Sequence, residues 1–372
     1  MPFVSINDIL GAPNLCGIIQ STVSGIPNPF PEAFFKVDQT VDGDTGEYKV
    51  FSGARTNATI SPYGAPSKNR QLREIGIKSV KLLHSIENIV LPVKDYINLL
   101  NYTELSKQRM GIDEVSRQIR EARWTQDNLR ISALTSMLFK TQIYYDGLGN
   151  LLPSSAGAQT AVDYAVPAGN QNQLDVFNTA TPIISTKWSD PTATIDKQLQ
   201  ALHQAAVQLT GYELKHAFYG KNVPNYLTSN NGLGNYFFRA NYGPEAFGPD
   251  YIATADIPNP LLGLTWHKAY QSFFYDQNGV RQTLVGDDQI VFTPEPSNAW
   301  IGFLEGTYPV PSKAGIITPA EPSVVSSIET KAGMFAYGAA SADPPTAKIV
   351  YGDTFLPVLK VPTAVFVATV KF

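Results

Sequence analysis

The strongest hydrophobic pattern in the chain lies between residues 113 and 144. Apolar side chains recur there at intervals of three, four or seven positions, and charged side chains fill much of the remaining face. This is the period of an amphipathic α-helix. Asp113 can cap its start, and Asp146-Gly147 can end it. At 1.5 Å per residue such a helix is about 48 Å long, so we expect it to span the molecule.

Shorter patterns predict one more helix and several strands. Leucine and alanine recur at helical spacing over residues 195–209, and Gly211 is placed to cap the end of that helix. Two short runs of aromatic and β-branched residues flank the turn 276–279, which is typical of a β-hairpin. Residues 358–371 alternate and predict a closing strand, with two prolines that favour an edge or a bulge. Together these elements predict a protein of the α+β class.

The first 33 residues predict an extended arm. They are apolar, but glycine or proline interrupts them every few positions, which leaves no room for a long helix. Residues 34–52 then alternate weakly around the polar turn 42–46 and predict a hairpin. The carboxylates of that turn do not complete the pattern of a calcium-binding EF-hand, so we interpret it as a polar turn.

Charged residues are sorted along the chain. Between residues 55 and 81, six basic side chains face a single acid, whereas residues 229–330 hold ten acids against four bases. Glycine and proline make the basic segment an excursion, which is either a solvated loop or a projection that meets an acidic neighbour. Aromatic residues do not alternate with its charges, which disfavours a nucleic-acid surface. The candidate subunit-contact residues are Arg55, Lys68, Arg70, Arg73, Lys78, Lys81, Asp287 and Asp288.

The amino-acid composition narrows the class of protein. Charged residues make up 16% of the 372 residues, and the formal net charge is −4, where an ordinary domain is about 25% charged. The abundant aromatic residues and the small net charge exclude a disordered chain. Sparse charge leaves two interpretations: a surface covered by neutral polar groups, or a large surface hidden in subunit contacts.

Targeting signals and disulfides are not evident in the sequence. The single Cys16 excludes an intrachain disulfide, and no basic residue precedes Lys36 to form the start of a signal peptide. Glycine and proline break the uncharged stretch 9–31 too often for a membrane span. We therefore expect a soluble protein of the cell interior with no membrane contact, built as two domains or as one elaborated domain.

Motifs of enzymes and cofactor sites are missing from the sequence. No P-loop, dinucleotide-binding, nucleophile-elbow or zinc-protease motif occurs. Cys16 has no neighbouring histidine, and Asp287 and Asp288 would point to opposite faces of a strand, which prevents a shared proton. The histidines are scattered and we interpret each as structural; they are His84, His203, His216 and His267. We expect no catalytic residue, no cofactor and no metal, which favours a structural role.

The order of these elements resembles one protein family. An apolar arm precedes a basic excursion, a long amphipathic helix and a mixed α+β region. The motifs that carry the likeness are Phe34-Phe35-Lys36, the helix 113–144 with the turn 146–150, the turn 188–191 before the second helix, the hairpin 277–281 with residues 287–291, and the proline motifs at 356–358 and 361–362. They resemble the tailed-phage major capsid proteins, specifically the lambda-like major capsid protein E family.

The resemblance implies an α+β fold of the HK97-like major capsid type. Five regions would follow one another along the chain. These are an N-terminal arm over 1–33, an extended hairpin loop over 34–98, a peripheral domain over 99–190 with the spine helix at about 113–144, an axial domain over 191–330, and return strands to the peripheral domain over 331–372.

The resemblance also implies a function. The chain would be the major capsid protein of a tailed bacteriophage, self-assembling as hexamers and pentamers into an icosahedral head that encloses double-stranded DNA without binding it specifically. Its partners would be portal and scaffolding proteins and a decoration protein, and the virion would be assembled in the cytoplasm of a bacterial host. Two alternatives stay open: an encapsulin-like shell around protein cargo, and a β-rich protein that binds or acts on glycans.

Overall fold

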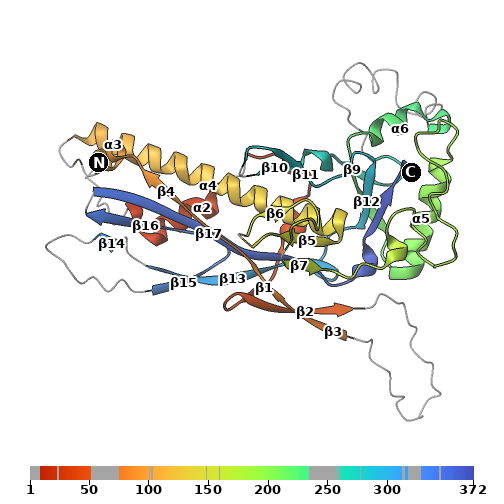
Figure 1. The fold of residues 1–372 in the computed structure, drawn as a ribbon, viewed down its shortest axis with the longest axis horizontal. Coiled ribbons are helices and arrows are strands. Elements are labelled where there is room, and N and C mark those ends of the chain that lie inside the picture. The colour runs from red at the N-terminus through yellow and green to blue at the C-terminus, as the bar shows by residue number, and fades with distance from the viewer. Residues whose placement is uncertain are drawn as a thin grey trace, which may run out of the picture.

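The computed structural model describes residues 9–22, 25–51, 75–99, 101, 104–147, 149–158, 160–233, 257, 260–276, 278–311, 315–316, 328–342 and 345–372. The molecule is elongated (Figure 1). At one end the long helix α4 (Leu105–Lys140) lies along a large β-sheet, and at the other end helices α5 (Ile195–Thr210) and α6 (Val223–Ser229) surround a smaller sheet. None of the helices in these ranges combines the length and the hydrophobicity that crossing a membrane requires.

Strand β17 (Pro345–Leu359) is the centre of the large sheet, which has seven strands. On one side it pairs with β4, and on the other side it pairs first with β16 and then with β13. Strands β1 and β15 pair with β13, and β14 pairs with β16. The bounds of these strands are β1 (Val37–Val41), β4 (Leu83–Leu91), β13 (Ile301–Pro311), β14 (Gly315–Ile316), β15 (Ile328–Ala332) and β16 (Phe335–Ala342). Helix α3 (Val93–Leu99) follows β4 and packs against α4.

The smaller sheet has four strands in the order β18-β12-β8-β9. They are β8 (Leu214–Tyr219), β9 (Thr265–His267), β12 (Gln289–Pro294) and β18 (Phe366–Thr369). Three further sheets are formed by β2 (Thr45–Phe51) with β3 (Ile75–Lys81), by β5 (Gln142–Tyr145) with β6 (Leu151–Leu152) and β7 (Thr160–Asp163), and by β10 (Phe273–Tyr275) with β11 (Arg281–Thr283). Short 3₁₀ helices occur at η1 (Glu32–Phe35), η2 (Ala168–Asn170), η3 (Ala269–Gln271) and η4 (Pro362–Ala364).

Two local predictions are confirmed. Helix α5 ends at Gly211, whose φ of 80° is left-handed and whose N–H donates to the Val207 carbonyl at 2.9 Å. Strands β10 and β11 form the predicted antiparallel hairpin. Its turn is closed by the Asp276 carboxylate, which accepts hydrogen bonds from the N–H groups of Asn278 and Val280 at 2.9 and 2.8 Å.

The long helix is also confirmed, but its predicted ends are wrong. Helix α4 runs from Leu105 to Lys140, whereas the apolar pattern predicts 113–144. Its first turns have no apolar period because they pack closely on α3: a Cβ atom at Gly111 would lie 2.9 Å from the Leu99 backbone nitrogen. At the other end, Thr141 adopts a left-handed backbone with a φ of 58°, and β5 begins at the next residue.

The prediction that the first 33 residues form an extended arm needs correction. Ala12–Ser21 form a ten-residue helix, α2, with Pro13 in its first turn, where the missing N–H removes no helical hydrogen bond. Leu15 and Ile19 are fully buried in a cluster with residues of α4 and the large sheet. The sequence does not predict α2 because Gly17 lies in its middle, where glycine is a poor helix former. Residues 1–8 and 23–24 of the predicted arm lie outside the described residues.

Two strand predictions are wrong in their pairing. Strands β1 and β2 flank the turn 42–44, but β1 pairs in parallel with β13 and β2 pairs with β3, so they form no hairpin together. The predicted closing strand 358–371 is divided, because Pro362 starts η4 between β17 and β18. Strand β18 pairs with β12 of the smaller sheet, so the last part of 331–372 does not return to the sheet that carries the long helix. The other domain boundaries stay predictions.

A buried ion cluster joins the long helix to the large sheet. The Arg130 guanidinium of α4 donates to both carboxylate oxygens of Asp353 in β17, at 2.5 and 2.8 Å, and to Glu305 in β13, at 2.9 Å. Asp353 is fully buried, and the Arg130 side chain is 12% exposed. The guanidinium also lies over the Phe355 ring, 5.3 Å from its centroid. Burial by itself lowers the pKa of Arg130, but the two carboxylates outweigh burial and raise that pKa above its ordinary value.

Replacing Arg130 should destabilise the folded chain strongly. Arg130→Met leaves two carboxylates facing each other without a cation, which should lower the free energy of unfolding by about 3–5 kcal/mol. Urea unfolding of the purified, unassembled chain measures this change. Arg117→Met is the matched control, because Arg117 lies on the same helix and pairs with Glu114 and Glu121 at the surface, where ion pairs add little. Equal unfolding midpoints for the two variants would contradict the role of the cluster.

Candidate subunit-contact surfaces

The predicted basic contact residues are only partly described. Arg55, Lys68, Arg70 and Arg73 lie outside the described residues. Lys78 and Lys81 lie on β3. The Lys78 ammonium group donates to the backbone carbonyl of Asp163 at 3.0 Å, so it already supports the fold of its own chain. Lys81 is 3.8 Å from the Asp44 carboxylate in a pair whose side chains are 70% and 64% exposed, so its charge is available to a partner.

The predicted acidic contact residues differ from each other in their surroundings. Asp287 and Asp288 lie in a turn before β12, not on a strand. Asp288 is half-buried, and its carboxylate accepts hydrogen bonds from the Asn222 side chain at 2.9 Å and from the Tyr226 hydroxyl. Partial burial, together with this hydrogen bond to Asp288, raises the pKa of Tyr226 to about 12. The Asp287 side chain is exposed, so Asp287 is the one of the two that a neighbouring subunit could meet.

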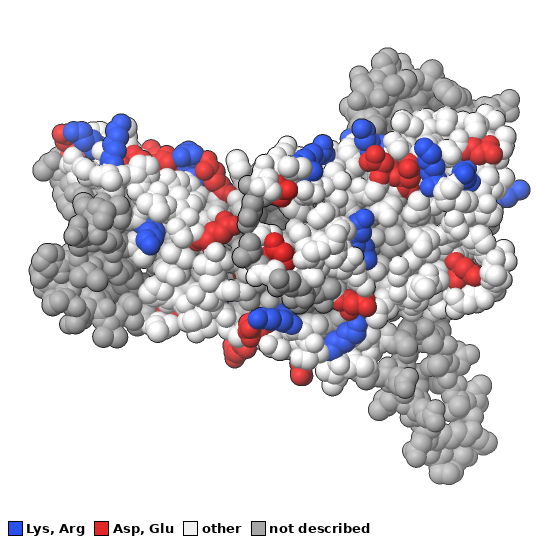
Figure 2. Space-filling view, viewed as in Figure 1, with Lys and Arg blue, Asp and Glu red and all other residues white. Residues whose placement is uncertain are grey.

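Charged side chains are sparse on the face of the molecule drawn in Figure 2, as they are in the sequence. Figure 2 shows scattered basic and acidic groups separated by wide areas that carry neither. Interfaces between subunits are depleted in charge at their centres, so these uncharged areas are suited to contacts with neighbouring copies.

Two histidines that are isolated in the sequence meet in the smaller sheet. His216 of β8 and His267 of β9 lie on paired parallel strands, and His216 Nδ1 is 2.9 Å from His267 Nε2. The other ring nitrogen of His216 is 3.1 Å from the Glu295 carboxylate. His216 is 7% exposed, the Phe34 ring packs edge-on against it, and Phe218 stacks on His267. Strand periodicity alone would not find this pair, because the two residues are 51 positions apart.

The surroundings of this histidine pair favour the neutral form of both rings, so their pKa values are lower than that of an ordinary histidine. Burial lowers the pKa of His216, and the Glu295 carboxylate opposes part of that shift. Burial and then the neighbouring His216 lower the pKa of His267 to about 4. Among the described residues neither ring has a hydroxyl or thiol partner, so the pair has no nucleophile to activate. No three His, Cys, Asp or Glu side chains gather as a metal site in the described part of the chain.

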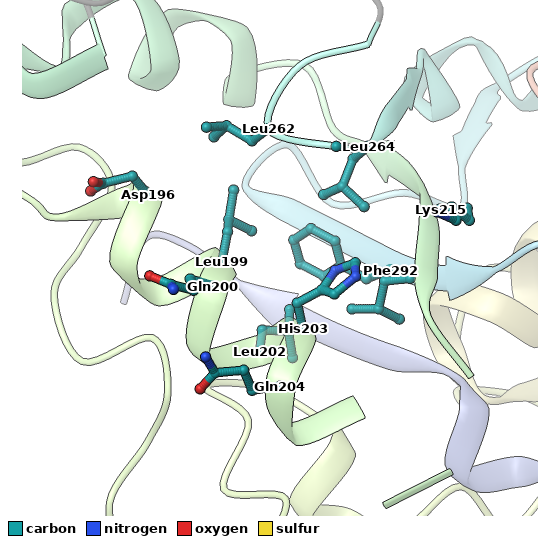
Figure 3. Close-up of a pocket in the computed structure, with 12 residues that line it drawn as sticks. Asp196, Leu199, Gln200, Leu202, His203, Gln204, Lys215, Leu262, Leu264 and Phe292 are labelled. Atoms are coloured by element: carbon teal, nitrogen blue, oxygen red, sulfur yellow. The ribbon is translucent and has the colours of Figure 1, made fainter. Parts of the chain in front are cut away.

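An open cavity of about 500 Å³ lies between α5, β8, β12 and the loop before β9 (Figure 3). Leu199, Leu202 and Phe292 contribute apolar side chains to its lining. Its titratable groups include Asp196 and His203, which are two turns of α5 apart and therefore about 10 Å apart along the helix axis. That distance excludes a direct proton transfer between them, so the cavity does not assemble an acid–base pair from these two groups.

Comparison with known families identifies the class of the protein. A family model described as "Phage major capsid protein E" matches residues 19–344. The chain therefore belongs to the phage major capsid protein E family. Its role is structural, as a self-associating subunit of the virion shell. Of the two alternatives, neither the shell around protein cargo nor the glycan-related protein is favoured.

Comparison with solved structures identifies the fold of the chain. A structure assigned as a prophage capsid protein from E. coli CFT073 matches with a TM-score of 0.55 at 12% identity, covering 97% of this chain and 99% of that one. A phage-related protein from Bordetella bronchiseptica matches at 9% identity over 98% of both chains, with a TM-score of 0.49. The capsid of cyanophage P-SCSP1u matches at 10% identity, with a TM-score of 0.43, over 94% of this chain and 90% of that one. No curated protein matches. The predicted HK97-like α+β capsid fold is confirmed.

The histidine pair should make the chain less stable in mild acid. Both rings bind protons more weakly when folded than in the unfolded chain, where histidine titrates near pH 6.5. Stability is therefore fully present above about pH 6.5 and falls as the pH drops toward about 4. His267→Gln removes one titrating ring and should reduce this loss by up to about 2 kcal/mol, after allowance for partial exposure.

Urea unfolding of both proteins at several pH values between about 4.5 and 8 provides the measurement. The two pH profiles should run parallel above about pH 7.5 and diverge below about pH 6.5. Profiles that stay parallel throughout the acid range would show that His267 is not titrating in the way its surroundings require.

Proposed function

We propose that this major capsid protein assembles as hexamers and pentamers into a closed icosahedral shell around double-stranded DNA. The family match over residues 19–344 carries the proposal. The sparse charge of the chain supports it, because a shell protein must bury contacts on several sides and interface centres are depleted in charge. The small net negative charge also fits a subunit that encloses DNA without binding it specifically.

The basic segment 55–81 is the proposed contact arm between neighbouring subunits. In this proposal it docks on acidic side chains within residues 229–330 of an adjacent copy, where opposite charges select the correct partner and speed association. The exposed position of Lys81 on β3 and of Asp287 before β12 supports this pairing. In this arrangement Asp288 serves its own subunit through Asn222 and Tyr226.

In the proposed shell, the two ends of the subunit have different roles. The part with the large sheet and α4 serves as the peripheral domain, and the part with the smaller sheet and α5 serves as the axial domain, which surrounds the hexamer and pentamer axes. Portal and scaffolding proteins, and a decoration protein, are the proposed partners in the cytoplasm of the bacterial host. The subunit has no enzymatic activity of its own in this proposal.

Electron microscopy of the purified protein tests the assembly directly. Negatively stained samples of the chain at high concentration should contain closed shells or ring-shaped capsomers. Particles purified from infected or induced cells should also contain DNA, which distinguishes a phage head from a shell around protein cargo. Small discrete particles at every concentration would contradict the proposal.

Reversing the basic charges should block assembly without unfolding the subunit. The double variant Arg70→Glu with Arg73→Glu should lower the yield of shells at least tenfold, because the segment would then face acids of its neighbour. Far-ultraviolet circular dichroism checks that the subunit stays folded. Lys197→Glu with Lys221→Glu is the control for net charge, since both of these lysines are exposed and lie outside the segment. Normal shells from the first variant, or equal losses from both, would contradict docking through this segment.

A further inference from the structure

The two edges of the large sheet differ in what covers their backbone groups. At one end of the strand order, helix α2 packs along β16 (Figure 1), over residues that no described strand pairs with on that side. The Gln20 side chain donates to the Met334 carbonyl at 3.0 Å, and Cys16 Sγ lies 3.2 Å from the Ala336 carbonyl oxygen and 3.3 Å from its N–H nitrogen. Farther along, β14 pairs with β16. This edge is therefore occupied by groups of the same chain.

The opposite edge of the sheet is β4, which pairs with no second strand in the part of the chain that the structure describes. All nine of its residues, Leu83–Leu91, pair with β17 in an unbroken register. In an antiparallel ladder, alternate residues direct their N–H and C=O groups away from the partner. Among the described residues no other strand and no backbone hydrogen bond meets β4 on that side. About half of its backbone groups thus face outward and meet no hydrogen-bond partner within the described ranges.

Strand β4 also lacks the devices that normally prevent such an edge from pairing. Natural edges are protected by proline, lysine, bulges or short length, but Leu83–Leu91 contain no proline or lysine, and their register has no bulge. The one formal charge is Glu87, whose carboxylate accepts a hydrogen bond from the Tyr351 hydroxyl. Ile86 and Val90, on the face turned away from α4, are 43% and 55% exposed.

We propose that the free edge of β4 is a pairing site for a strand of a second copy of this chain, so that the large sheet continues from one subunit into the next. The inference rests on the proposed function, because a shell subunit always has copies of itself beside it. Glu87 is the one formal charge along the edge and is held by the Tyr351 hydroxyl, so the edge suits a neutral strand. The exposed Ile86 and Val90 add apolar contact. Two backbones paired over nine residues also fix the angle between subunits, which side-chain contact alone does not.

Hydrogen–deuterium exchange tests the proposal on the full chain, dilute and concentrated. Amides of residues 83–91 that point outward should exchange quickly in the dilute subunit and at least a hundredfold more slowly once copies associate. Contact between side chains alone leaves those amides fast, so the measurement separates sheet extension from ordinary packing.

A matched pair of variants locates the effect on the edge. Val90→Lys places a charge on β4 and should raise the concentration needed for association at least tenfold. Val280→Lys is the control, because Val280 is 54% exposed, nearly the same as Val90, but lies next to the β10–β11 turn. Val90→Thr keeps a neutral β-branched side chain and should behave like the unmodified protein.

Three results would overturn the inference. If copies associate while the 83–91 amides stay fast, the edge is not an interface and the inference fails, although the proposed shell function stands. If those amides are already slow in the dilute subunit, the chain covers its own edge and the inference fails in the same way. If the protein stays monomeric at every concentration, both the inference and the proposed function are overturned.

Discussion

The ion cluster of Arg130, Asp353 and Glu305 is the contact on which the large-sheet end of the molecule depends. It ties α4 to the central strand β17 and to β13 at one point. A shift that separated Asp353 from its cation would leave an uncompensated buried charge, which is strongly destabilising. The cluster therefore sets the register in which the long helix lies on the sheet.

Periodicity in the sequence predicts the helices whose faces are apolar and fails where a helix packs through small or polar residues. Helix α5 and its Gly211 cap follow from spacing alone. The start of α4 does not, because its first turns bury Gln108 and Gly111 against neighbouring structure. Helix α2 carries Pro13 and Gly17, two residues typical of loops, and it is stabilised by burial against segments far away in the sequence.

Pairing between distant segments is the part that the sequence could not predict. Arg130 and Asp353 are 223 positions apart, and nothing in the spacing of charges relates them. The same holds for β1, which pairs with β13 although the nearest partner in the chain is β2. Of the candidate contact residues, burial decides between Asp287 and Asp288 only once the fold is known, since the two are adjacent and identical in chemistry.

The contact between α2 and β16 also governs when a subunit becomes complete. Cys16 and Ala336 are separated by 320 positions, so helix α2 can meet its strand only after the ribosome has made all the residues between them. Such long-range contacts form slowly, because a large loop must close before they are gained. A nascent chain that stops before residue 335 therefore lacks both the strand that α2 covers and the central strand β17, and with them the sheet to which β4 belongs. Only subunits whose synthesis has passed β17 can present the complete large sheet to neighbouring copies, so the order of the strands along the chain delays association until the sheet is formed.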